Sequence, residues 1–139
     1  MKLIYSMFFL LFLAFVSCDE EADSTIFRYG VETDFRKDVV YTSEDNALKV
    51  EVGKISDSRC PTGVVCIWQG EATVTIQALH FLSTTPLGNL VLSTFHNPTD
   101  TLGMTWSFKL INVKPYPVYQ QETDSSSIVT TMVINRIKN

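Results

Sequence analysis

The chain has 139 residues, of which 45% are hydrophobic and 19% charged, and its formal net charge is −4. This length suits one domain and leaves no room for a second core. The composition excludes collagens, coiled coils, low-complexity chains and proteins with several membrane spans. Without residues 1–17, 10 basic and 15 acidic residues remain, and no basic tract is present, so we expect no binding to nucleic acid.

Residues 1–17 have the features of an export signal. Lys2 provides a positive charge before an apolar run that is shorter than the roughly 20 residues a helix needs to span a bilayer. A signal that ends just before a cysteine, here Cys18, resembles the bacterial lipoprotein signal. The resemblance implies that the Cys18 thiol receives a diacylglycerol and that the chain is cut in front of it. The alternative is an ordinary signal peptide with Cys18 as a spare thiol.

Residues 18–26 are predicted to be the lipidated cysteine and an acidic tether. The stretch 19–24 is too acidic and too poor in apolar side chains to pack. An acidic run beside the lipidated cysteine also resembles the surface-export signal of lipoproteins in the Bacteroidetes, although a merely solvated linker is the alternative. We therefore expect a protein of the outer membrane or cell surface that is held by a lipid anchor.

Residues 27–139 are predicted to form a single all-β domain, because no stretch keeps a 3.6-residue period over the length of a helix. Apolar and polar residues alternate instead, most clearly from Glu71 to Ala78. Turn-forming residues separate these runs, and turns or loops are expected at 43–46, 86–89, 96–100 and 124–127. The expected strands are 39–42, 47–55, 71–78, 90–95, a strand from Trp106 that stops at Lys114, and 128–137.

About six strands at hairpin spacing in about 115 residues favour a small antiparallel barrel or a sandwich. The sequence leaves both architectures open. The strands 71–78 and 90–95 are expected to form a hairpin around a turn at Pro86–Asn89.

The segment 57–72 is the most specific feature of the sequence. Three cysteines in an exported chain leave one unpaired, and lipidation of Cys18 leaves Cys60 and Cys66 to pair with each other. Closing so short a ring stabilises a protein by roughly 2 kcal/mol. Within the segment, Gly63 permits a turn and Trp68 offers a large amphipathic surface.

The pattern D-S-R-C-P-x-G-V-x-C-x-W-x-G-E-A in this segment is similar to a family of small exported bacterial proteins, many of them lipoproteins. The run 115–117, Pro-Tyr-Pro, also resembles the later half of that family. The layout of a lipid-anchored, single-domain β protein looks like the potempins, which are surface inhibitors of secreted proteases. That resemblance implies a shallow barrel of the oligosaccharide/oligonucleotide-binding type and an exported protease as partner.

No catalytic residue, metal site or cofactor is predicted, and we do not expect an enzyme. His80 lies on the inward register of its strand, which favours a histidine in the core or at an edge. His96 precedes Asn-Pro and is expected to be an exposed turn residue. The cysteines lack the spacing of zinc ligands, and the acidic tether lacks the pattern of a calcium loop.

These observations favour a binding protein, specifically an inhibitor of an exported protease. An inhibitor needs a loop that is rigid before contact, and Trp and Arg are common interface anchors. The alternative is a ligand-binding or structural envelope lipoprotein, in which the disulfide is only a staple and Trp68 lies in the core. Exposed aromatic residues such as Tyr116 and Tyr119 can also bind a glycan, and a monomer is expected. The predicted binding loop comprises Arg59, Pro61, Thr62, Gly63, Val64, Val65 and Trp68.

Overall fold

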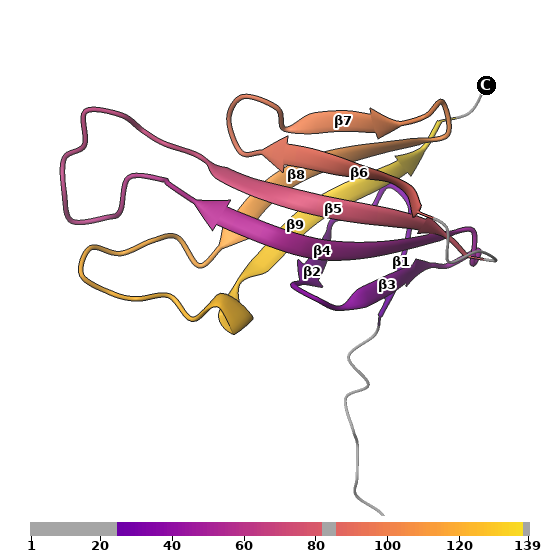
Figure 1. Cartoon of the computed structure of the whole chain (residues 1–139), viewed down its shortest axis with the longest axis horizontal. Helices are drawn as coiled ribbons and strands as arrows, with labels where there is room; N and C mark the ends of the chain where they lie inside the picture. Colours follow the sequence, from indigo (N-terminus) through magenta and orange to yellow (C-terminus); the bar gives the residue numbers. More distant parts are fainter. Residues whose placement is uncertain (1–24, 82–85, 138–139) are drawn as a thin grey trace, which may run out of the picture.

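The computed structural model describes residues 25–81 and 86–137 (Figure 1). The expected signal segment and the predicted lipidation site, Cys18, lie outside these residues. Within them the chain is all-β, as predicted, and no helix is long and apolar enough to cross a membrane. The strands are β1 (Ile26–Phe27), β2 (Thr33–Arg36), β3 (Val40–Ser43), β4 (Leu48–Asp57), β5 (Ala72–His80), β6 (Pro86–Ser93), β7 (Thr99–Leu102), β8 (Trp106–Lys114) and β9 (Val129–Arg136).

The strands form two sheets that pack face to face (Figure 1). One sheet has the order β1-β3-β4-β5-β6, and the other has the order β2-β9-β8-β7. All pairings between these strands are antiparallel except that of β1 with β3. The sheets do not close into a barrel, so the fold is a sandwich.

The alternating runs of the sequence build the core. Alternate residues point inward from Leu48 to Val52 of β4 and from Ala72 to Ala78 of β5. Trp106, Phe108 and Leu110 of β8 face them from the second sheet. Aromatic rings close one side of this core, with Phe35 lying 5.7 Å from Phe27 and 4.7 Å from Tyr41 between ring centroids. The prediction of strands with one buried face is therefore confirmed.

Several strand boundaries differ from the sequence prediction. Residues 86–89 belong to β6 and not to a turn, because Asn89 and Gly88 continue the ladder opposite Gln77 and Ala78. Thr99 and Asp100 belong to β7 and not to a loop, because they pair with β8. The short strands β1, β2 and β7 were not predicted as such, and β1 begins within the range assigned to the tether. At residues 86–89 and 99–100, pairing with a neighbouring strand outweighs the local turn propensity.

The two long loops, which connect β4 to β5 and β8 to β9, lie at one end of the sandwich (Figure 1). Strand β1 lies toward the other end. Ile26 pairs with Thr42, which in turn pairs with Lys49 near the start of β4. The loop between β4 and β5 begins after Asp57, at the opposite end of the same strand.

Candidate functional site

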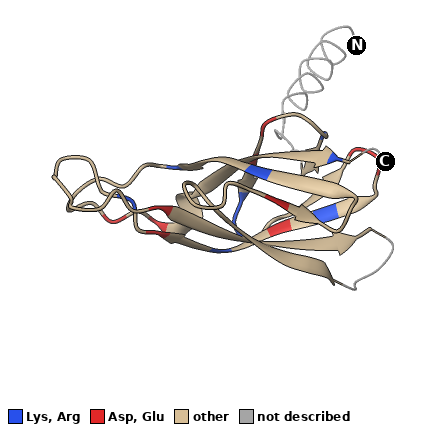
Figure 2. Ribbon diagram, turned by 90° about the horizontal axis from the view of Figure 1, so that it is seen from above, with Lys and Arg blue, Asp and Glu red and all other residues tan. Residues whose placement is uncertain are grey.

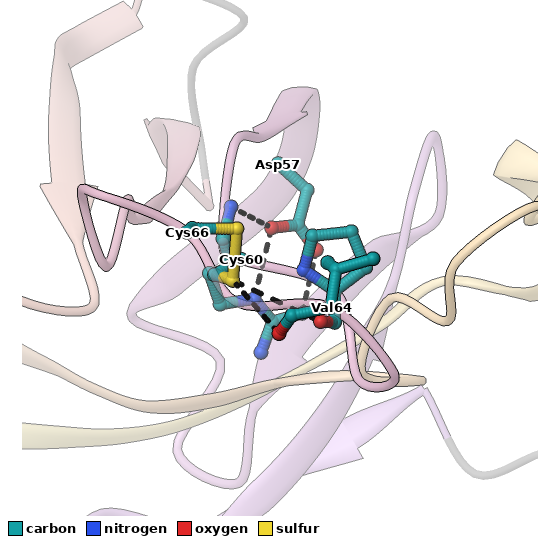
Figure 3. Close-up of a disulfide and its surroundings, with 6 residues drawn as sticks. Asp57, Cys60, Val64 and Cys66 are labelled. Atoms are coloured by element: carbon teal, nitrogen blue, oxygen red, sulfur yellow. Dashed lines mark hydrogen bonds and ion pairs between the residues drawn. A yellow bond between two sulfur atoms is a disulfide. The ribbon is translucent and has the colours of Figure 1, made fainter.

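The β4–β5 loop (residues 58–71) has a paired stem and a disulfide. The stem continues the β4–β5 ladder through backbone hydrogen bonds from Ser58 N–H to the Glu71 carbonyl (2.9 Å) and from Cys60 N–H to the Gln69 carbonyl (2.8 Å). The predicted disulfide joins Cys60 to Cys66, whose Cα atoms are 5.9 Å apart (Figure 3). The ring therefore closes directly beyond the last pair of the stem.

A second brace connects this loop to the β8–β9 loop (residues 115–128). Thr62 N–H donates to the Pro117 carbonyl at 3.0 Å, and Tyr119 N–H donates to the Thr62 carbonyl at 3.1 Å. These bonds form a short parallel bridge between Thr62 and Val118. The Pro-Tyr-Pro run thus supports the disulfide loop from the second sheet.

Arg59, which was predicted to belong to the binding loop, is a third brace. Its Nε and Nη2 atoms donate to the Asp57 carboxylate at 2.9 and 2.6 Å, and Nη2 also approaches the Pro115 carbonyl at 3.3 Å. The guanidinium lies 4.5 Å from the centroid of the Tyr116 ring. Only 8% of Arg59 is exposed. The contacts with Asp57, Pro115 and Tyr116 offset the cost of burying its charge. Arg59 therefore supports the loop from below.

The end of the loop is apolar and exposed. Val65 is 102% exposed, Ile67 94% and Trp68 82%, and we refer to these three residues as the apolar tip. Trp68 is therefore not in the core, which overturns the interpretation of the loop as a staple around a buried tryptophan. Ile67 was not among the predicted loop residues, although its place between Cys66 and Trp68 is a signal that could have identified it.

The other predicted loop residues, 61–64, lie within the disulfide ring. Pro61 and Val64 are half-buried, whereas Thr62 and Gly63 are exposed. Gly63 has a φ of +94°, so the turn expected at this glycine is present. The segment 60–70 contains no charged residue, and the ribbon in Figure 2 is tan, the colour of residues other than Lys, Arg, Asp and Glu, over the outer part of this end.

Exposed apolar residues from other elements extend the surface beside the tip. Phe95, in the connection between β6 and β7, is 65% exposed, and Ile111 on β8 is also exposed. The β8–β9 loop contributes Tyr116, Val118 and Tyr119, all exposed. More than half of the large hydrophobic residues exposed in the described part of the chain lie at this end. Sequence spacing could not bring Phe95 and Ile111 to this place, because they lie on separate strands or connections.

His96 and Glu71 form the titratable pair at this end. His96 Nδ1 lies 2.9 Å from Glu71 Oε2, and the His96 side chain is exposed, as predicted. Hydrogen bonds from His96 and then Ser93 hold the pKa of Glu71 below its ordinary value. His80 lies at the end of β5 and is exposed, so it is not a core residue.

Among residues 25–81 and 86–137, no group of three or more His, Cys, Asp or Glu side chains is arranged to hold a metal ion. No family model, curated protein or solved structure matches the chain.

Proposed function

We propose that the protein is a lipid-anchored binding protein of the outer membrane or cell surface, and that its apolar tip inhibits an exported protease. The observation that carries this proposal is the exposure of Val65, Ile67 and Trp68 on a loop with three separate braces. A role of the disulfide as a staple alone accounts for the braces but gives no reason for the exposed tip.

The energetics of the tip favour a partner. Full burial of one large apolar side chain contributes about 1.5–3 kcal/mol, and the tip leaves three such side chains in water. Binding would recover this free energy. The disulfide and the Thr62–Val118 bridge already restrict the backbone, so little conformational entropy remains to be lost on binding.

The covalent ring is suited to contact with a protease. If a protease cut the chain between Cys60 and Cys66, the disulfide would still join the two new ends. The loop segment 58–71 contains one basic residue, Arg59, which is buried in its ion pair with Asp57. We therefore expect the target to prefer apolar side chains over basic ones.

The position of β1 is compatible with an anchor. The chain enters the first sheet near the start of β4, whereas the loop follows the end of β4. A lipid on Cys18 would leave the apolar tip pointing away from the anchored end. A partner could then approach the tip from the surrounding medium.

The test is an inhibition assay with the chain from Asp19 onward against exported proteases of apolar and of basic specificity. We expect stoichiometric inhibition of a protease with apolar specificity. Ile67→Ala and Trp68→Ala should each weaken inhibition by about tenfold or more. Met104→Ala is the matched control, since Met104 is 77% exposed in the β7–β8 connection, away from the loop. Inhibition that survives both tip variants, or no inhibition of any exported protease, would reject the proposal.

A further inference from the structure

Two adjoining hollows lie beside the apolar tip. The first has a volume of about 410 Å³ and is lined by Trp68, Phe95, Glu71 and neighbouring residues. The second has a volume of about 210 Å³ and is lined by residues that include Phe95, Tyr116 and Arg59. Gln69, Gly70 and Phe95 line both, so the hollows share a wall. We refer to the two hollows together as the aromatic groove.

Three aromatic side chains follow one another along this groove. Trp68 lines the first hollow, Phe95 lines both, and Tyr116 lines the second. They are 82%, 65% and 46% exposed, respectively, so a large part of each side chain is open to a ligand. The Phe95 ring is held edge-to-face by His96, with 5.0 Å between the ring centroids. The Tyr116 ring is held by the Arg59 guanidinium.

The groove also contains both donors and acceptors of hydrogen bonds. In its ion pair with Asp57, the Arg59 guanidinium donates through Nε and Nη2. Its third nitrogen, Nη1, makes no hydrogen bond to any described residue. Asn112 Oδ1 accepts from the Val113 N–H, which leaves its Nδ2 as a donor at the second hollow. Glu71 provides a carboxylate at the first hollow. Gln69 provides an amide between them.

The charges of the groove disfavour a ligand with a net charge. An anionic ligand at Arg59 would approach Glu71 in the adjoining hollow, and a cationic ligand at Glu71 would approach Arg59. Each of these two charges also has its own partner, Asp57 for Arg59 and His96 for Glu71. A neutral ligand that both donates and accepts hydrogen bonds avoids this repulsion.

We infer that the aromatic groove binds a neutral oligosaccharide of at least two sugar units. The C–H faces of sugar rings are apolar and can pack on the Trp68, Phe95 and Tyr116 rings. Sugar hydroxyls both donate and accept, which matches Arg59 Nη1, the two amides and the Glu71 carboxylate. The larger hollow falls in the range of about 300–1,000 Å³ that is usual for ligand sites, and the smaller hollow provides a second subsite.

This activity shares Trp68 with the proposed inhibition but can be separated from it at other residues. Val65 and Ile67 of the apolar tip do not line either hollow, whereas Phe95 lines both and does not belong to the tip. Variants can therefore remove one activity and leave the other. A failure of either proposal can be recognised without reference to the other.

The test uses the chain from Asp19 onward and an array of neutral and acidic oligosaccharides, followed by titration of the neutral oligosaccharides. Trp68 is exposed and Trp106 is buried, so a ligand in the groove should protect the accessible tryptophan fluorescence from iodide. We expect binding of neutral oligosaccharides and weaker binding of the corresponding monosaccharides. Phe95→Ala and Trp68→Ala should each lower the affinity by about tenfold. Ile67→Ala, a substitution of another exposed residue on the same loop, should leave it unchanged.

Three results would overturn the inference. The first is the absence of binding to any neutral oligosaccharide at millimolar concentration. The second is binding confined to acidic oligosaccharides or to peptides. The third is binding of a neutral oligosaccharide that persists unchanged in Phe95→Ala, provided that this variant unfolds at the same denaturant concentration as the parent.

Discussion

The two ends of β4 are closed by different chemistry. The β3–β4 turn is organised by one carboxylate: Asp45 Oδ1 accepts from the Ser43 hydroxyl, the Ala47 N–H and the Tyr29 hydroxyl at 2.7–3.1 Å. Asp45 Oδ2 accepts from Arg136 Nη1 at 3.0 Å. The β4–β5 loop at the other end relies on a disulfide, backbone pairing and an ion pair below its apolar tip.

This difference separates a turn that only closes the fold from a loop that presents a surface. The Asp45 carboxylate of the β3–β4 turn is satisfied by donors within the turn and from its neighbours. The β4–β5 loop has its polar and covalent contacts at the base and leaves its large apolar side chains in water. Stability at the first end therefore depends on side-chain hydrogen bonds, and at the second on backbone geometry and the disulfide.

The largest effect is expected from Gly70→Ala in the loop stem. Gly70 has a φ of +66°, and an added Cβ would lie 1.9 Å from the Ser58 carbonyl oxygen, so the stem would have to open. We expect a loss of about 3 kcal/mol in the free energy of unfolding, measured by chemical denaturation. Gly103→Ala is the matched control, because Gly103 has a φ of +59° but no atom within 4 Å of the added Cβ. Its loss should be only about 1 kcal/mol. Equal losses in the two variants would show that the stem is not tightly closed at Gly70.

An intermediate effect is expected from the double variant Cys60→Ser and Cys66→Ser. Removal of the ring should lower the free energy of unfolding by about 2 kcal/mol, because the unfolded chain regains the entropy of the open loop. Far-ultraviolet circular dichroism should still show the sandwich, because the core and the Thr62–Val118 bridge do not include the sulfur atoms. The parent protein in reductant should match the double variant, which itself should not respond to reductant. A double variant as stable as the parent would contradict this account.

The smallest effect is expected from Asp45→Asn at the opposite end, and it should depend on pH. Partial burial raises the pKa of Asp45, but hydrogen bonds from Ser43, Ala47 and Tyr29 and the charge of Arg136 outweigh it and hold the pKa below its ordinary value of 3.8. A lowered pKa in the folded state means that the carboxylate stabilises the fold above pH 3.8 and that this contribution is lost as the pH falls through the lowered pKa.

We therefore expect Asp45→Asn to cost about 1 kcal/mol at pH 7. The difference between variant and parent should remain constant down to about pH 5 and shrink below pH 3.8. Denaturant titrations of both proteins at each pH check this, because other carboxyl groups titrate alike in the two and cancel. A difference that stays the same at pH 3 would show that the charge of Asp45 contributes nothing.

The sequence predicted the long strands because each buries one face. Leu48, Val50 and Val52 alternate with polar residues in the sequence, and all three are buried in the folded domain. Strands of two to four residues, such as Thr99–Leu102, are too short to show a period. The residues Pro86–Asn89 have turn propensity, but their pairing with β5 decides their conformation.

The candidate site was predicted only in part, for a similar reason. The disulfide followed from the number and spacing of the cysteines, which are local features. The burial of Arg59 depends on Pro115 and Tyr116, more than fifty residues away, and no local pattern indicates that contact. The position of Phe95 beside Trp68 likewise depends on the arrangement of the sheets.

The parallel strand β1 has a consequence for the response of the domain to force. If the chain is tethered at its amino-terminal side, tension enters the sandwich through β1. It first meets the hydrogen bonds from Thr42 N–H to the Thr25 carbonyl and from Glu44 N–H to the Phe27 carbonyl. Peeling these bonds would also draw Phe27, which is 2% exposed, out of its contacts with Tyr29 and Phe35. Phe27 would thus act as a mechanical latch, and β2, the next strand along the chain, would be loaded only after that latch had opened.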